Sequence, residues 1–364
     1  MFPVYQFLIY QFLIYQVLPL PFLSMQKLEY VLRRIVTSLL VLVGVTIITF
    51  TLARIVPSNP AALYIGPKAR PADIERVSKE LGLDKPLVVQ YFTYMKSLAK
   101  GDLGISIGSK RPVLQEITTR LPATLELLFT AMIFAILIGI PAGVISASMQ
   151  GKWPDIFVRT GSIIGVSMPA FWLGLLLQII FFRHLGWLPL SGRISSDIRF
   201  TAPIEDITGF YLIDTFITGN WVAFKDAALH LVLPALTLAA YPIGLIARMT
   251  RGSMLEVLEQ DYIRTARAYG LSKPKITYVY ALKNAIGPAL TVVGLTFAFA
   301  LTGSFFVEVV FNWPGLGQFT VRALLNVDYP AVMGVTLLGA MGYVTINLLV
   351  DLVQAWIDPR ISLQ

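Results

Sequence analysis

The chain has 364 residues, of which 56% are hydrophobic and only 14% are charged. Soluble domains carry about 25% charged residues, and here the apolar residues gather in blocks of roughly 20, so the composition argues against a soluble fold. The net charge of +8 comes without a separate basic domain, which argues against a nucleic-acid-binding protein, and the lack of cysteine excludes a disulfide scaffold, a thiolate nucleophile and a cysteine metal site.

The first 24 residues form an apolar stretch with a five-residue repeat at residues 5–9 and 10–14. It lacks the basic start and the cleavage site of a signal peptide. Pro19 and Pro21 end it, and Met25 opens an ordinary lead-in to the next apolar segment. Two interpretations are open: a translated upstream stretch with no role, or an added helix or interfacial anchor. The first predicts that a chain starting at Met25 inserts and functions normally.

Windows of about 19 residues identify the membrane segments that follow. We expect six membrane helices, at residues 35–56, 121–149, 156–182, 229–247, 286–310 and 331–350. Glycines at 161, 165 and 174 have the spacing of close helix packing, and prolines at 169, 234, 242 and 288 can kink helices and so shape a cavity.

Lysines and arginines indicate the topology, because short cytoplasmic loops are rich in both. Lys27, Arg33 and Arg34 precede the first segment, so its start lies in the cytoplasm. Alternation then places residues 150–155 and 248–283 inside, and the second of these loops has seven basic residues against three acidic ones. The connections at 57–120 and 183–225 are expected outside.

The outer connection at 57–120 has an organisation of its own. Residues 71–82 begin with a proline and an acidic turn and stop at a glycine, which are helix start and stop signals. A second helix is predicted from residue 86 to about 98. Together they make a small external cap rather than an independent domain.

Enzyme motifs are weak in this chain. Residues 104–110 resemble a phosphate loop, but the spacing is too short and the segment is expected outside. There is no H-E-x-x-H zinc signature, and both histidines, His184 and His230, lie at the ends of membrane segments. We therefore predict no catalytic, cofactor or metal site in this chain.

The cytoplasmic stretch 261–271 carries the most local signal. It has strong helix formers, ends at Gly270, and places Ile263, Ala266 and Gly270 on one narrow, small and apolar face. Arg264 and Arg267 lie beside that face. From composition alone this helix either docks on another protein or lies on anionic lipid, attracted by its arginines.

This stretch resembles the "EAA" loop of ABC-transporter permeases, in the version found in the dipeptide/oligopeptide permease family. Arg264-Thr265-Ala266 takes the place of Glu-Ala-Ala, Gly270 takes the place of the glycine, and no I-x-L-P follows at the general spacing. Further strings resemble the B-type subunit of that family over most of the chain after Met25: 57–60, 81–86, 101–104, 120–124, 185–189, 313–317 and 358–360.

The resemblance implies an all-α, multi-pass protein of the cell (cytoplasmic) membrane, a type I ABC importer permease that forms half of a translocation pathway. It implies four partners: a second homologous permease subunit, two cytoplasmic ATPases and an external solute-binding protein. The residues of the ATPase-coupling helix would then be Asp261, Ile263, Arg264, Thr265, Ala266, Arg267, Gly270 and Leu271. The cargo stays open between dipeptides, oligopeptides, oligosaccharides and metal complexes.

The domain expectations follow from these readings. Residues 25–56 hold the first membrane helix with its lead-in, 57–120 the external cap, 121–357 a five-helix permease core with the coupling loop 248–283, and 358–364 a cytoplasmic tail.

Two carboxylates, Glu126 and Glu308, lie in or near membrane segments and are candidates for the pathway or a gate, since charges there are costly. Each could instead be solvated, or pair with an arginine such as Arg120 or Arg322. The alternative function is an ATP-independent secondary carrier, but we find neither a carboxylate at the centre of a segment nor an inverted repeat. A membrane-bound enzyme is the third candidate.

Overall fold

A computed structural model describes residues 25–55, 60–65, 70–80 and 82–357 of the chain. The N-terminal repeat and the tail 358–364 lie outside the described residues. Within the described ranges there is no strand, and the only sheet-like contact is one antiparallel bridge between Ile105 and Pro112. The all-helical fold class is confirmed.

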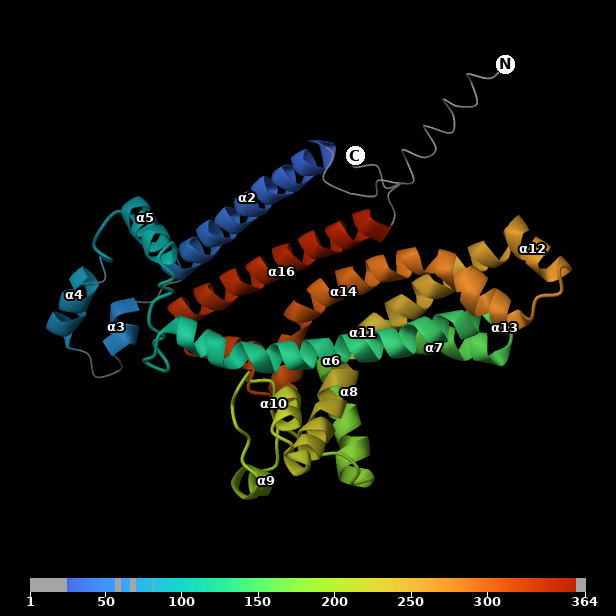
Figure 1. Cartoon of the computed structure of the whole chain (residues 1–364). Coiled ribbons are helices and arrows are strands. Elements are labelled where there is room, and N and C mark those ends of the chain that lie inside the picture. Colours follow the sequence, from blue (N-terminus) through green and yellow to red (C-terminus); the bar gives the residue numbers. More distant parts are fainter. Residues whose placement is uncertain (1–24, 56–59, 66–69, 81, 358–364) are drawn as a thin grey trace, which may run out of the picture.

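Long helices run side by side along one axis of the molecule (Figure 1). They are α2 (Met25–Ile55), α6 (Val113–Ser148), α11 (Trp221–Leu258), α14 (Leu282–Val310) and α16 (Tyr329–Ile357). Five spans of the described chain are long and apolar enough to cross a bilayer, and a bent helix pair makes a sixth. Since α6 and α11 have 36 and 38 residues, each exceeds the roughly 30 Å of a bilayer core by more than about 20 Å.

The expected membrane segment 156–182 is bent at Pro169, one of the prolines predicted to kink helices. Helix α7 (Trp153–Ser167) ends just before this proline. It is followed by α8 (Ala170–Leu177) and the π-helical turn η1 (Gln178–His184), and the angle between α7 and this second part is 112°. The cause is Pro169, which has no N–H to donate and forces the residue before it out of the helical region. Met168 is accordingly extended, with φ −79° and ψ 130°.

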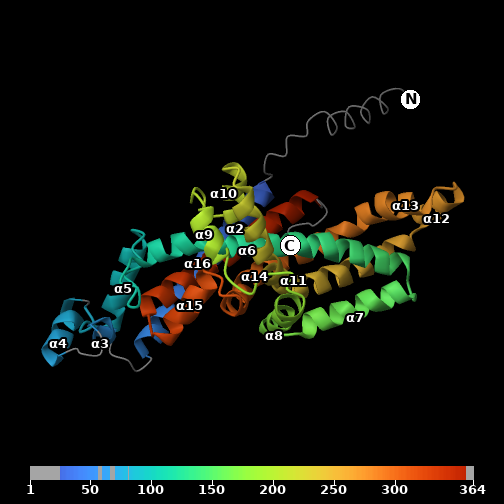
Figure 2. The ribbon, with the colours of Figure 1, turned by 90° about the horizontal axis from the view of Figure 1, so that it is seen from below.

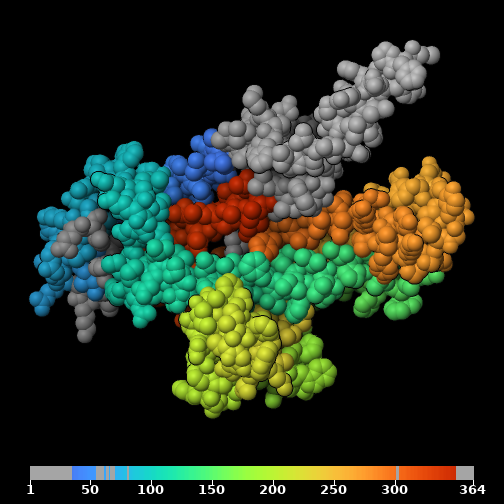
Figure 3. Space-filling model, in the orientation of Figure 1, coloured from blue at the N-terminus to red at the C-terminus, as the bar shows by residue number. Residues whose placement is uncertain are grey.

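The small cap lies at one end of the bundle, opposite α12 (Asp261–Ala268) and α13 (Lys273–Lys275) (Figure 1). It consists of α3 (Pro60–Ile65), α4 (Pro71–Glu80) and α5 (Leu87–Leu98), so both helices expected in this region are present. A side lobe made of α8, η1, α9 (Ser196–Thr201) and α10 (Tyr211–Ile217) projects from the bundle (Figures 1 and 3) and faces the viewer when the molecule is seen from below (Figure 2).

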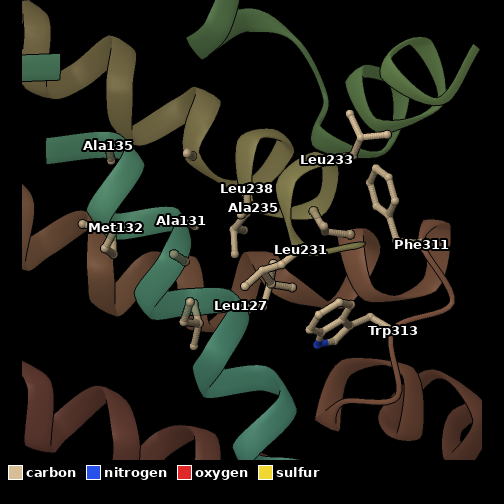
Figure 4. Close-up of a cluster of buried hydrophobic side chains, with 14 of the residues drawn as sticks. Leu127, Ala131, Met132, Ala135, Leu231, Leu233, Ala235, Leu238, Phe311 and Trp313 are labelled. Carbon is tan, nitrogen blue, oxygen red and sulfur yellow. The ribbon is translucent and has the colours of Figure 1, made fainter. Parts of the chain in front are cut away.

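The main core lies where α6 and α11 cross, and it extends to Phe311 and Trp313 after α14 (Figure 4). Gly139 and Gly143 let the two helices approach closely: a Cβ on Gly143 would lie 2.5 Å from Cβ of Thr250. This Gly-xxx-Gly spacing is typical of membrane helix packing. Of the glycines singled out above, Gly165 and Gly174 also have close neighbours, while Gly161 faces open space.

Candidate functional site

The segment 261–271, which carries the strongest sequence signal, forms a short helix at one end of the bundle (Figure 1). Helix α12 follows α11 after the extended residue Gln260. It is followed by α13 and the π-helical turn η2 (Ile276–Ala281), which leads into α14. Two long membrane helices, α11 and α14, are therefore joined through α12.

The end of α12 explains its glycine. Gly270 has φ +73°, a left-handed conformation that glycine adopts without strain. Its N–H donates to the Arg267 carbonyl at 3.0 Å, and the Leu271 N–H donates to the Ala266 carbonyl at 3.2 Å. This pair of bonds is the Schellman helix end. A Cβ on Gly270 would meet no atom within 4 Å, so backbone conformation rather than close packing requires the glycine.

The small apolar face of α12 points into this chain. Ile263 is fully buried and Ala266 is 8% exposed. Both belong to a hydrophobic cluster, here called the α12 seat, formed with Val144 and Ala147 of α6, Met254 of α11, Ile276 and Ala281 of η2, and Ala285 of α14. The face of Ile263 and Ala266, expected to meet another protein, is thus covered by this chain, and the part of these residues in ATPase coupling stays a prediction. Burying these apolar side chains against the helix ends stabilises the seat.

The opposite face of α12 is open and polar. Asp261, Arg264, Thr265 and Arg267 are exposed, and Tyr269 directly after the helix is 83% exposed. Arg264 Nη1 lies 3.2 Å from Asp261 Oδ1, but both side chains are largely exposed, so the pair contributes little stability. An exposed aromatic among charged groups is typical of a protein contact surface.

A buried ion pair, which the sequence pattern did not reveal, holds the helix ends next to the α12 seat. The Asp155 carboxylate at the start of α7 is 1% exposed and accepts hydrogen bonds from Arg251 Nε at 2.7 Å and Arg251 Nη2 at 3.1 Å. Ser146 Oγ and the Gly151 N–H donate to the same carboxylate. These contacts join α6, α7 and α11. The partners are 96 residues apart, so no local spacing could have indicated them.

Glu126 pairs with neither arginine proposed from the sequence. Its carboxylate accepts a hydrogen bond from Arg193 Nη2 at 2.5 Å and one from the Leu212 N–H at 2.8 Å. The Arg193 guanidinium also lies 3.7 Å from the ring centroid of Tyr211. Arg120 instead pairs with Glu116, one helical turn away. Glu126 thus fastens the side lobe to α6.

Glu308 is also engaged within the chain. It is fully buried, and it accepts hydrogen bonds from Thr124 Oγ1 at 2.8 Å and the Gln318 N–H at 3.1 Å, not from Arg322. Gln318 lies in the first turn of α15 (Leu316–Leu325), where a carboxylate is favourable. A role of Glu126 or Glu308 in the pathway stays a prediction, and these contacts give it no support.

A cavity lies beside the bend of the α7–α8 pair, between α7, α8, α11 and α14. It has a volume of about 170 Å³ and is lined by Gly165, Met168, Thr237, Tyr241 and Pro242 among others. Pro169, predicted to shape a cavity, lies between two of its lining residues, and Pro242 is one of them. The hollow is mostly apolar, with two threonine hydroxyls and one phenol.

The family profile described as "Binding-protein-dependent transport system inner membrane component" matches residues 139–363, and a profile for the N-terminal region of such membrane components matches residues 27–128. Together the two profiles cover most of the chain after the N-terminal repeat.

Three similar proteins match nearly the whole chain. The probable D,D-dipeptide transport system permease protein of Escherichia coli is 47% identical over 89% of this chain and 94% of its own length. The dipeptide transport system permease protein of Alkalihalophilus pseudofirmus is 45% identical over 92% of this chain and 99% of its own. The di/tripeptide transport system permease protein of Pseudomonas aeruginosa is 43% identical over 93% and 99%.

Proposed function

This chain belongs to the family of binding-protein-dependent transport system inner membrane components, and from this premise we propose that it imports short peptides and is driven through the exposed face of α12. The family makes it a permease subunit of an ABC importer and a multi-pass protein of the cytoplasmic membrane. It is a transport subunit, not an enzyme, and ATP is hydrolysed on partner chains. A secondary carrier and a membrane-bound enzyme are set aside.

Membership of the family indicates which kinds of subunit the complex contains, while their numbers are part of our proposal. Importers of this class combine permease subunits with ATPases and a substrate-binding protein. We propose the assembly expected from the sequence: a second homologous permease, two cytoplasmic ATPases and one external solute-binding protein. The cap at the end opposite α12 would then face the binding protein.

The proposed cargo is a peptide of two or three residues. Its support is the match to three relatives that are named for D,D-dipeptide, dipeptide and di/tripeptide transport, each over about nine tenths of this chain. Oligosaccharides and metal complexes, which the sequence left open, have no counterpart among these names.

The proposed coupling contact is the polar face of α12. Its support is the α12 seat: the helix is held on its apolar side by the ends of three membrane helices, while Asp261, Arg264, Thr265 and Tyr269 are open. The alternative, a helix resting on lipid, needs an apolar face to enter the headgroup region. Ile263 and Ala266 are already covered by this chain, so that face is not available.

A reconstituted complex tests the cargo. Proteoliposomes containing this chain, its partner permease, the ATPases and the binding protein should take up labelled di- and tripeptides when ATP is supplied, and should not take up maltose-type oligosaccharides. Uptake of oligosaccharides without uptake of peptides would refute the proposed cargo.

Charge reversal tests the coupling contact. Arg264→Glu and Tyr269→Ala should lower ATPase association and the ATP hydrolysis stimulated by the binding protein, while the permease itself stays folded because both side chains are exposed. Lys152→Glu is the matched control, since it reverses an exposed charge in the other predicted cytoplasmic loop. If Arg264→Glu and Tyr269→Ala bind the ATPases as well as the control Lys152→Glu does, α12 is not the contact.

A further inference from the structure

A large cavity lies beside the cap, at the end of the bundle opposite α12 (Figure 1). It has a volume of about 500 Å³ and lies between α2, α5, α16 and the loop at 102–107. Its size is that of pockets that bind small molecules. No sequence motif indicated it, because its walls come from five separate stretches of the chain.

Gln90 and Arg54, two of its lining residues, each have one buried side-chain atom without a hydrogen-bond partner among the described residues. Gln90 is only 9% exposed, and its Nε2 donates to the carbonyls of Leu83 at 3.1 Å and Lys85 at 2.8 Å. These bonds fix the amide and leave Oε1 buried without a donor. Nε of Arg54 is buried in the same way. Buried polar atoms are nearly always paired in native proteins, so two unpaired ones on residues that line the same cavity point to a ligand.

The remaining wall is apolar with a few charges. Phe50, Leu103 and Met333 line it, and the Phe50 ring stacks on Tyr94 at a centroid distance of 5.9 Å. The Arg54 guanidinium lies 5.4 Å from the Phe50 centroid.

Side chains of both charges line this cavity, together with the Tyr94 phenol. Burial raises the pKa of the Tyr94 phenol, so it stays neutral and can donate a hydrogen bond. Arg54 and Lys85 line the cavity as cations and Asp102 as an anion. One Asp102 oxygen already accepts the Gly104 N–H. Lys79 also lines the cavity, but it pairs with Glu75.

We propose that this cavity binds a short peptide through its free carboxylate, one backbone N–H and an apolar side chain. Arg54 would bind the carboxylate, Gln90 Oε1 would accept the N–H, and Phe50 with Leu103 would contact the side chain. Asp102 is placed to attract the amino terminus. The choice of ligand class rests on the proposed peptide cargo, while the site itself rests on the cavity and its two unpaired polar atoms.

Equilibrium binding of labelled Ala-Phe tests the site. The complete permease complex in lipid nanodiscs is used without the binding protein, so that this protein cannot contribute binding. We expect saturable binding that weakens by about tenfold or more in Arg54→Met and in Gln90→Leu, because each variant removes one polar contact to the ligand. Ala-Phe amide, which lacks the carboxylate, should bind the original protein weakly and should not respond to Arg54→Met.

Matched controls separate the site from general damage. Arg111→Met and Gln115→Leu alter exposed side chains of the same types outside the cavity and should leave Ala-Phe binding unchanged. Thr93→Trp fills the cavity from an exposed position on α5 and should abolish binding without disturbing the packed core. This variant keeps the test valid if Arg54→Met fails to fold.

The outcomes for the site and for the proposed function are distinct. Ala-Phe binding that is absent, or equal in all variants, overturns the site even if the complex imports peptides. A lipid found in the cavity by native mass spectrometry that Ala-Phe does not displace also overturns it. Binding that depends on Arg54 and Gln90 supports the site, even if uptake shows that the transported cargo is not a peptide.

Discussion

Removing Arg251 should destabilise the end of the bundle next to α12. Its guanidinium nitrogens lie 2.7 and 3.1 Å from the Asp155 carboxylate, which is 1% exposed. Loss of one partner of a buried ion pair costs about 3–5 kcal/mol, because the other charge stays buried and unpaired. Asp155 would keep the hydrogen bonds from Ser146 and Gly151. We therefore expect Arg251→Met to cost about 3 kcal/mol, at the lower end of that range.

Asp155→Asn should cost less than Arg251→Met. In this variant Arg251 loses its anionic partner, but its side chain is 21% exposed and can reach water. The free energy of unfolding should therefore fall only by the contribution of a charge-assisted hydrogen bond, about 1.5–3 kcal/mol. The double variant should cost less than the sum of the two single variants, because both break the same contact.

Unfolding of the purified permease in mixed micelles by denaturant measures these differences, with Arg159→Met as the control for loss of an exposed arginine on α7. A loss in Arg251→Met no larger than in this control, or strictly additive single variants, would refute the reasoning.

Three further predictions concern other sites. Gly270→Val should reduce stimulated ATP hydrolysis, because a left-handed conformation at φ +73° costs an L residue about 1–2 kcal/mol, whereas Gly270→Asn should retain most activity; equal activities would contradict the assigned helix end. Gly315→Ala should lower the unfolding midpoint and the yield of folded protein, since its Cβ would lie 2.5 Å from the Glu308 carboxylate; an unchanged midpoint would count against this contact. A reporter fused at Ser272 should read cytoplasmic and one at Ser195 external, and the reverse pattern would invert the topology.

Hydropathy could predict the membrane helices because it averages over many residues. The expected segment 121–149 coincides to within one residue at its end with α6, although α6 starts earlier, at Val113. The mean hydropathy of a window did not show the bend at Pro169. That bend depends on the local geometry of one proline. The partner of Glu126 lies 67 residues away in the chain, and no periodicity links it to Arg193.

Helix α12 shows where sequence reasoning about a site stops. The spacing of Ile263, Ala266 and Gly270 correctly indicated an apolar side, since both Ile263 and Ala266 are buried. It could not show what covers that side, because a neighbouring segment of the same chain and a separate protein offer the same apolar contacts. The cavity of the cap was out of reach for a related reason, as its lining residues are distributed from Phe50 to Met333.

The attachment of α12 has a mechanical consequence. A close-packed interface has low compressibility, so a push on the exposed side of this helix is transmitted with little slack to the ends of α6, α11 and α14 together. The helix would then move together with these helix ends and would not rotate against them. The break between α7 and α8 differs from this seat, because a cavity of about 170 Å³ lies beside it and neighbouring side chains do not fill the space.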